Sequence, residues 1–170
     1  MSPLRLLAPV NSCDGRYADS LDVRFTRLCD NACPFCIEAS GIPDRGTDVP
    51  AMIAATLNAP HGTVLILGGE PLLMVDQVHE YVTAIRPHKH GIYVTTSLPR
   101  TLTRNIGMFL ALARLVDGIN VSLQHHDWRI NNDLLRSRNP YNRIDFLQQM
   151  LGDDDVAGKT RVSINLVRGG

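Results

Sequence analysis

Apolar residues recur along the chain with two spacings, one typical of strands and one typical of helices. Five short apolar stretches predict strands, which cover residues 22–28, 63–67, 92–97, 118–124 and 160–167. Between them, apolar residues recur every three or four positions, as on a helix that covers a sheet with one face. The residues that predict these four helices are Val49, Met52, Ile53 and Leu57; Met74, Val75, Val78, Tyr81, Val82 and Ile85; Leu102, Ile106, Phe109, Leu110 and Ala113; and Ile144, Leu147 and Leu151, followed by Gly152 where a C-cap is expected.

The alternation of strands and helices predicts an α/β fold with parallel strands. A complete eight-unit barrel needs about 250 residues, whereas this chain has 170. We therefore predict an open or partial (β/α) barrel. Because a strand left at a sheet edge exposes unpaired backbone groups, we expect the barrel to be incomplete on its C-terminal side. Residues 1–20 are expected to form an irregular segment, and residues 21–170 the core domain.

Two strands carry a polar face beside an apolar one. In residues 118–124, Asn120 and Ser122 alternate with apolar residues. In residues 160–167, Ser163 and Asn165 alternate with the apolar residues Val162, Ile164 and Leu166. Polar side chains that point into a barrel near the carboxyl ends of its strands predict a site there.

The overall composition excludes several classes of protein. Hydrophobic residues make up 44% and charged residues 20%, which is ordinary for a soluble globular chain. No apolar run is long enough to span a membrane, and the first ten residues make a poor signal peptide, so a cytoplasmic location is the default expectation. With 17 basic and 17 acidic residues, no net charge attracts the chain to nucleic acid or anionic lipid.

Three of the four cysteines, Cys29, Cys33 and Cys36, are spaced C-x3-C-x2-C directly after the first predicted strand. In a parallel α/β fold this loop lies at the carboxyl ends of the strands, where ligands bind. Three thiols in eight residues suit a metal better than disulfides. A four-iron cluster usually takes four thiolates, so three would leave one iron open. Structural zinc, with Cys13 or a histidine as fourth ligand, is the alternative, although its usual second ligand pair is lacking.

The stretch CDNACPFC after RFTRL resembles the cluster loop of the radical S-adenosylmethionine (SAM) superfamily, including Phe35 before the third cysteine. The second predicted strand ends in GGEP, residues 68–71, which resembles a motif of the same family. A glycine pair at a strand end is more often only a turn, but the cysteine loop about 30 residues earlier strengthens the resemblance. It implies a 4Fe-4S cluster on the three cysteines and reductive cleavage of SAM to a 5′-deoxyadenosyl radical that abstracts hydrogen from a substrate.

The GGEP stretch has a physical interpretation of its own. Gly68 and Gly69 would let the backbone approach a ligand without interference from a Cβ atom. Glu70, with Pro71 after it, would offer an acceptor for a cationic amino group, and SAM carries such a group.

The resemblance implies further cofactor contacts. Ser122 is similar to a fourth-strand residue that contacts the ribose, and Thr96 and Ser97 resemble polar residues that face the cofactor, although β-propensity explains strand threonines equally well. The closing SINLVRGG resembles the fifth strand of the branch that contains the molybdopterin-precursor cyclase and peptide-modifying enzymes. Asn165 would then lie near the adenine.

Arg138 is expected to pair with the SAM carboxylate. Arg129 and Arg136 compete for this role, and a solvent-exposed arginine is the alternative for all three.

His125 and His126, with Asp127, follow the fourth strand and either act as acid or base or are solvated. Residues 86–90 (RPHKH) are expected on the surface, and residues 153–155 in a solvated turn.

The resemblance also implies a reductant such as flavodoxin or ferredoxin and a substrate that is a small molecule, peptide or nucleoside. Two other functions remain open from the sequence. One is a small metal-binding or electron-transfer module without SAM chemistry. The other is a truncated, inactive protein that binds SAM or a partner.

Overall fold

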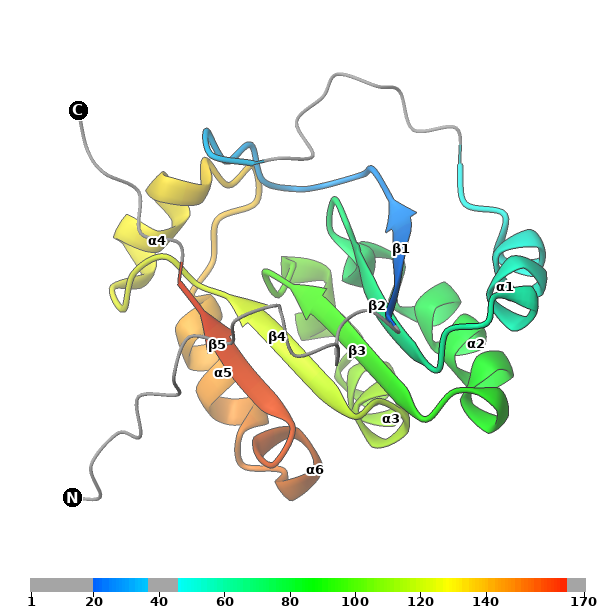
Figure 1. The fold of residues 1–170 in the computed structure, drawn as a ribbon. Coiled ribbons are helices and arrows are strands. Elements are labelled where there is room, and N and C mark those ends of the chain that lie inside the picture. Colours follow the sequence, from blue (N-terminus) through cyan, green and yellow to red (C-terminus); the bar gives the residue numbers. More distant parts are fainter. Residues whose placement is uncertain (1–19, 37–45, 165–170) are drawn as a thin grey trace, which may run out of the picture.

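The computed structural model describes residues 20–36 and 46–164, and its five strands form one parallel sheet in the order β1-β2-β3-β4-β5 (Figure 1). All five strands lie where the sequence predicts them, and the α/β fold with a partial barrel is confirmed. The strands are β1 (Ser20–Thr26), β2 (Thr63–Gly68), β3 (Gly91–Thr96), β4 (Gly118–Ser122) and β5 (Thr160–Ser163).

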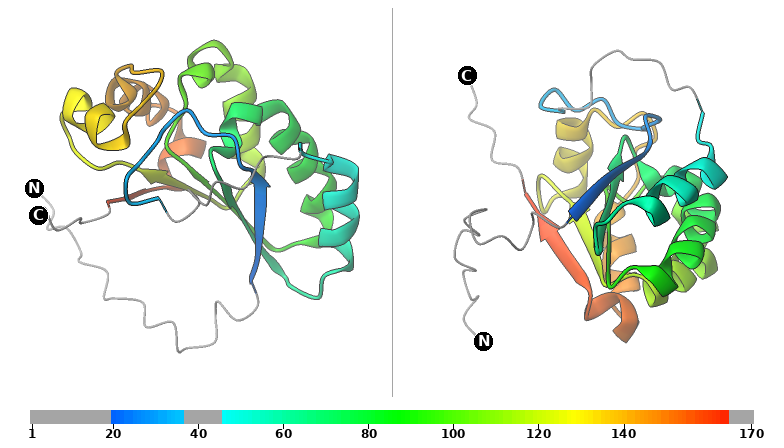
Figure 2. Two further views of the ribbon diagram at one scale, coloured as in Figure 1. Left: turned by 90° about the horizontal axis from the view of Figure 1, so that it is seen from above. Right: turned by 45° about the vertical axis from the view of Figure 1, so that its right-hand side comes forward.

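The helices follow the strands in βα order, and the four predicted helices are present. Helices α1, α2 and α3 cover one face of the sheet, and the opposite face carries no helix of the described residues (Figure 2). The helices are α1 (Val49–Asn58), α2 (Val75–Ile85), α3 (Ile106–Leu115), α4 (Trp128–Leu135), α5 (Arg143–Met150) and α6 (Asp154–Ala157), with 3-10 turns η1 (Pro71–Met74), η2 (Arg86–His88) and η3 (Arg100–Arg104). None of the helices in the described ranges has the length and apolar character needed to cross a membrane.

Helix α4 was not predicted, because its pattern of apolar and polar residues is inverted. Asn131 and Asn132 are buried, whereas Ile130 and Leu134 are 44% and 43% exposed. The carboxylate of Asp127 caps the helix by accepting hydrogen bonds from two backbone N–H groups in its first turn. This aspartate was the signal in the sequence that marks the start of α4.

In the acidic run 153–155, Asp154 and Asp155 are exposed to solvent as expected, but the run begins a short helix instead of forming a turn. Asp153 caps α6, and Arg114 at the end of α3 lies 3.7 Å from a carboxylate oxygen of Asp153 and 3.3 Å from one of Asp155. The carboxylates therefore begin a short helix and face the end of a longer one. Gly152 follows the C-cap residue Leu151 of α5 as expected, but its backbone is not left-handed.

The hydrophobic core lies between the sheet and its helices. Strand β4 shows the predicted division, because Ile119 and Val121 are buried in the core while Asn120 and Ser122 are half-buried on the other face. The same expectation was wrong for β5, where Val162 and Ile164 are 51% and 56% exposed. β5 pairs only with β4 among the described strands, and edge strands lack neighbours on one side.

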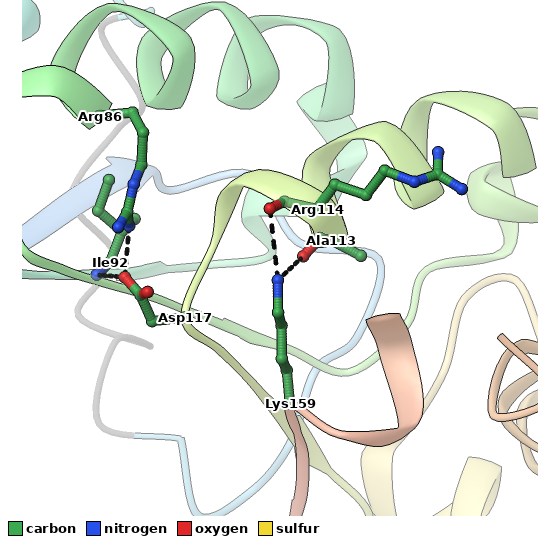
Figure 3. A network of polar contacts seen from close by, with 6 residues as sticks. All are labelled: Arg86, Ile92, Ala113, Arg114, Asp117 and Lys159. Atoms are coloured by element: carbon green, nitrogen blue, oxygen red, sulfur yellow. Dashed lines mark hydrogen bonds and ion pairs between the residues drawn. The ribbon is translucent and has the colours of Figure 1, made fainter. Parts of the chain in front are cut away.

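Two residues, Asp117 and Lys159, each make two polar contacts that stabilise the amino-terminal side of the sheet (Figure 3). Asp117, just before β4, accepts a hydrogen bond from the backbone N–H of Ile92 at 2.8 Å and pairs with Arg86. The Nζ of Lys159, just before β5, donates to two carbonyl oxygens in the last turn of α3, at 2.9 and 3.3 Å. A lysine at this position satisfies free carbonyl groups and complements the helix dipole.

Lys89 performs a similar task beside α1. Its ammonium donates to the carbonyl oxygens of Ala59 at 2.9 Å and His61 at 2.7 Å, and its side chain is only 7% exposed. The surface assignment of residues 86–90 was therefore wrong for Lys89, because these carbonyl groups replace water around its charge. His88 and His90 are exposed as expected.

Candidate functional site

The three cysteines lie in the loop that leaves β1 at the carboxyl ends of the strands, as predicted (Figure 1). Cys29 and Cys33 are half-buried and Cys36 is exposed. The loop turns tightly between the last two cysteines, where the N–H of Cys36 donates to the carbonyl oxygen of Cys33 at 3.1 Å. Within the described residues, no three His, Cys, Asp or Glu side chains are gathered as the ligands of one metal ion would be.

The environment of Cys29 and Cys33 raises the pKa of both thiols and so favours their protonated form. Burial raises the pKa of Cys29 from 9.0 to about 11, and the nearby acidic groups Glu70, Asp30 and Cys33 raise it further, against a hydrogen bond from a backbone N–H. Burial also raises the pKa of Cys33. Metal binding requires thiolates, and a positively charged metal centre would offset this electrostatic penalty. The three thiols are donors of the kind that an iron-sulfur cluster takes, although in the described residues they are not gathered around one point.

The cysteine loop is attached on one side to the end of α4 and the residues after it. The N–H of Ala32 donates to the carbonyl oxygen of Leu135 at 3.0 Å, and the N–H of Arg138 donates to that of Asp30 at 2.8 Å. Because both bonds join backbone groups, they fix the path of the loop whatever its side chains are.

The glycine pair serves a different purpose from the one expected. A Cβ atom on Gly68 would lie 2.4 Å from the carbonyl oxygen of Thr26, and one on Gly69 would lie 2.3 Å from that of Leu28. The N–H groups of Gly69 and Glu70 donate to these same two oxygens, both at 2.7 Å. The glycines thus allow the end of β2 to approach the backbone that leads into the cysteine loop, and that backbone fills the space that was expected for a ligand.

Glu70 is only 1% exposed, and both of its carboxylate oxygens are engaged by protein donors. Oε1 accepts from the N–H of Leu72 at 3.1 Å and the hydroxyl of Thr96 at 2.7 Å. Oε2 accepts from the N–H and the hydroxyl of Ser97, both at 2.7 Å. Burial raises the pKa of Glu70, and these four hydrogen bonds oppose the shift. Glu70 therefore joins the end of β2 to the end of β3.

The expectation that Thr96 faces a cofactor is not supported, because its side chain is 2% exposed and its hydroxyl is bonded within the protein. The hydroxyl of Ser97 accepts a hydrogen bond from the side-chain amide of Asn31 at 2.8 Å. The next residue, Leu98, has a left-handed backbone with a φ of 58°. Its carbonyl oxygen accepts from the hydroxyl of Tyr141 at 2.6 Å.

Arg143, at the start of α5, is the residue of the site that sequence reasoning missed. Its side chain is fully buried. One guanidinium nitrogen donates to the hydroxyl of Ser137 at 3.1 Å, and the guanidinium carbon lies 5.5 Å from the ring centroid of Tyr141. Nε and Nη1 find no hydrogen-bond partner among the described residues, and neither does Oδ1 of Asp30 or of Asn31. Nothing in the sequence distinguishes this arginine from its neighbours except its position at the start of a helix.

The other predicted site residues are placed as follows. Arg138, Arg129 and Arg136 all have exposed side chains, which is the alternative that the sequence left open for them. Arg136 is the C-cap of α4 in a left-handed conformation. The guanidinium of Arg129 lies 4.7 Å from the ring centroid of Trp128.

Ser122 is half-buried at the end of β4, on the face that no described helix covers, and Phe35 is half-buried in the cysteine loop. Pro71 is buried at the first position of η1. Asn165 lies outside the described residues.

The two histidines after β4 stack on each other, with ring centroids 4.3 Å apart. Nδ1 of His125 accepts a hydrogen bond from the N–H of Asp127 at 2.9 Å. Backbone N–H groups of Ile130 and Arg129 lower the pKa of Asp127, so this carboxylate is a helix cap and a poor base.

Comparison with known proteins agrees with the fold. The structure is similar to that of Streptococcus suis SuiB bound to its precursor peptide SuiA, with a TM-score of 0.67, 21% sequence identity, and coverage of 89% of this chain and 34% of that chain. For SuiB bound to S-adenosylmethionine the TM-score is 0.64, with 19% identity and coverage of 89% and 35%.

The chain thus spans about a third of the length of these two solved chains. No curated protein matches. The model of the family described as the Radical SAM superfamily matches residues 23–151. That match includes the cysteine loop, the glycine turn and Arg143, and the chain belongs to the radical SAM superfamily.

Proposed function

We propose that the chain is the core of a radical SAM enzyme, which holds a 4Fe-4S cluster on Cys29, Cys33 and Cys36 and cleaves SAM reductively. The observation that carries the proposal is the direct attachment of the cysteine loop to the Gly68–Glu70 turn. When bound, the cluster supplies the electron that breaks a carbon–sulfur bond of SAM and yields methionine and a 5′-deoxyadenosyl radical. That radical would take a hydrogen atom from a carbon of the substrate. Residues 21–170 would together form this core.

The chain's own residues provide partners for the amino acid part of SAM. Nε and Nη1 of Arg143 are buried donors without a partner in the described residues, and a guanidinium binds a carboxylate with charge-assisted hydrogen bonds. We therefore assign the SAM carboxylate to Arg143, in place of Arg138. Oδ1 of Asn31 is a buried acceptor that also lacks a partner there. It would accept a hydrogen bond from the SAM ammonium beside the acidic group of Glu70.

The face of the sheet without a helix would receive the substrate. It presents half-buried polar side chains, of which Asn120 and Ser122 come from β4. A reductant such as flavodoxin or ferredoxin would supply the electron. A substrate that is a small molecule, peptide or nucleoside would place one C–H bond above the carboxyl ends of the strands, next to the cysteine loop.

Metal analysis of cysteine variants tests the ligand assignment. After anaerobic reconstitution, wild-type protein should hold about four irons and four sulfides per chain. Cys33→Ser should lose most of this iron, whereas Cys13→Ser should keep it. Equal loss in both variants, or about one zinc per chain without sulfide, would support the metal-binding module instead.

A further inference from the structure

We propose that Asn31 and Ser97 are positioning residues, which hold the cysteine loop at a fixed distance from the Glu70 turn. This role depends on the proposed function, since it matters for activity only if the cysteine loop holds a cluster and the Glu70 turn helps to bind SAM. It rests on this chain's own hydrogen bonds for its geometry. Neither residue is a cysteine or part of the GGEP stretch.

The two residues form a directional chain of hydrogen bonds across three segments. The side-chain amide of Asn31 donates to the hydroxyl of Ser97 at 2.8 Å, and that hydroxyl donates to Oε2 of Glu70 at 2.7 Å. Asn31 and Ser97 are separated by 66 positions in the sequence. These two hydrogen bonds therefore link the cysteine loop, the end of β3 and the end of β2 through side chains alone.

The two ends of the link are shielded from water, and Ser97 between them is half-buried. Glu70 is 1% exposed and Asn31 is 7% exposed. A buried hydrogen bond to a charged group contributes more than an exposed one, because the separated partners cannot turn to water instead. Breaking the link at one residue therefore leaves a polar partner unsatisfied, which favours movement of the loop.

The turn that carries Ser97 is itself held in an unusual conformation. Leu98 has a φ of 58°, which is costly for a residue other than glycine. Two hydrogen bonds hold it there: its N–H donates to the hydroxyl of Thr96 at 2.9 Å, and its carbonyl oxygen accepts from Tyr141 at 2.6 Å. The surrounding structure thus imposes the position of Ser97, as a fixed attachment point requires.

The link completes the attachment of the cysteine loop. Backbone bonds already fix its start against the Gly68–Glu70 turn, and Asp30 and Ala32 against the end of α4. Asn31 lies between these last two residues and ties the same segment to β3. Because reaction rates fall steeply when reacting groups are misplaced by about 1 Å, this third attachment would determine how well SAM meets the cluster.

A test on the apoprotein measures the position of the loop without any cofactor. Variants Asn31→Ala and Ser97→Ala are treated with iodoacetamide, and the rate of modification at each cysteine is followed by mass spectrometry. Thr56→Val is the matched control, because it removes a buried 2.7 Å hydrogen bond to Tyr81 away from the site. Both site variants should be modified severalfold faster at Cys29 and Cys33 than wild type, and Ser97→Thr should restore the slow rate.

The second measurement uses the protein with its reconstituted cluster. Asn31→Ala and Ser97→Ala should both keep wild-type iron content. Ser97 has no assigned contact with SAM, so Ser97→Ala isolates the positioning role and should bind SAM about tenfold more weakly, as the loss of one hydrogen bond to a charged group implies. Asn31→Ala should bind SAM at least as weakly, because it also removes the acceptor assigned to the SAM ammonium. The double variant should bind SAM no more weakly than Asn31→Ala alone, because replacing Asn31 already breaks the series of hydrogen bonds to which Ser97 belongs. Thr56→Val should bind SAM like wild type.

The modification rates test the positioning role, and the response of the wild-type protein to SAM tests the proposed function. Unchanged modification rates at the cysteines, or rates no faster than in Thr56→Val, would overturn the positioning role. If wild-type protein itself shows no response to SAM, the proposed function fails, while the modification rates still decide whether Asn31 and Ser97 hold the loop. Faster modification together with unchanged SAM affinity would also overturn the inference, because the loop position would then not matter for the cofactor.

Discussion

Gly69 lies so close to Leu28 that a Cβ atom on the glycine would be 2.3 Å from the carbonyl oxygen of the leucine. This contact joins the turn after β2 to the residue just before Cys29. The requirement for glycine therefore comes from the protein's own backbone. Because the contacting atom is a backbone oxygen, it cannot move aside as the end of a flexible side chain could.

We expect Gly69→Ala to lower the free energy of unfolding by about 1–3 kcal/mol, as overpacking does, and to impair cluster assembly. Gly107→Ala is the matched control, because a Cβ atom there meets nothing within 4 Å. Gly107 lies in α3, so alanine should stabilise the protein by about 0.5–1 kcal/mol. Urea denaturation measures the unfolding free energy of both variants. A Gly69→Ala variant as stable as wild type would mean that the two segments are not in close contact.

Replacement by methionine is expected to weaken SAM binding at Arg143 and to leave it unchanged at Arg138. Arg143→Met should weaken SAM binding more than tenfold, because a charge-assisted hydrogen bond contributes about 1.5–3 kcal/mol. The same change should also lower the unfolding free energy of the apoprotein, because it leaves the buried carboxylate of Asp30 without the positive charge of Arg143 and removes the hydrogen bond to Ser137. Isothermal titration calorimetry and urea denaturation give the two values.

Arg138→Met is the control for that prediction. Its side chain is exposed, and its N–H bond to Asp30 involves the backbone, so both SAM affinity and stability should stay close to wild type. Weaker SAM binding in Arg138→Met than in Arg143→Met would restore the assignment made from the sequence.

The apoprotein should lose stability at high pH because of Cys29. Its thiol has a pKa of about 11 in the folded protein, against 9.0 without burial. Between these values the unfolded chain releases the proton while the folded chain retains it. The contribution to stability is therefore complete below pH 9 and is lost as the pH rises towards 11.

Urea denaturation across this pH range tests the sign of the effect. Cys29→Ser has no thiol to titrate at this position, so its unfolding free energy should fall less steeply than that of wild type. Parallel pH profiles for the two proteins would show that Cys29 is not buried in the folded apoprotein.

Lys159 should matter for stability and not for the site. Its ammonium bonds to carbonyl groups at the end of α3, on the amino-terminal side of the sheet (Figure 3). Lys159→Met should lower the free energy of unfolding by about 1 kcal/mol. Iron content and SAM affinity should remain at wild-type values, and a parallel loss of SAM affinity would contradict this separation of the two ends.

The sequence predicts most of the fold because strands β2, β3 and β4 and the long helices bury one regular apolar face. Helix α4 escaped prediction because Asn131 and Asn132 occupy its buried positions. Oδ1 of Asn131 accepts from the N–H groups of Gln124 and His125 at 2.7 and 3.3 Å. Tertiary hydrogen bonds, and not an apolar stripe, therefore hold this helix in place. Such bonds cannot be predicted from the local pattern of apolar and polar residues.

The site was predictable where chemistry depends on local spacing. The three cysteines and the GGEP stretch are visible as motifs, whereas Arg143 is identified only by burial and by its unpartnered nitrogen atoms. The packing role of the glycines escaped the sequence interpretation for the same reason. Only the packed structure shows that the backbone of residues 26–28 occupies the space beside them.

The central claim is that the loop of Cys29, Cys33 and Cys36 and the adjoining turn together bind a cluster and SAM for radical chemistry. Electron paramagnetic resonance of the anaerobically reconstituted and reduced protein, recorded with and without SAM, tests it most directly. We predict that SAM changes the spectrum of the cluster and that 5′-deoxyadenosine forms when excess reductant is present. A spectrum that is identical with and without SAM, together with no 5′-deoxyadenosine, would contradict the account.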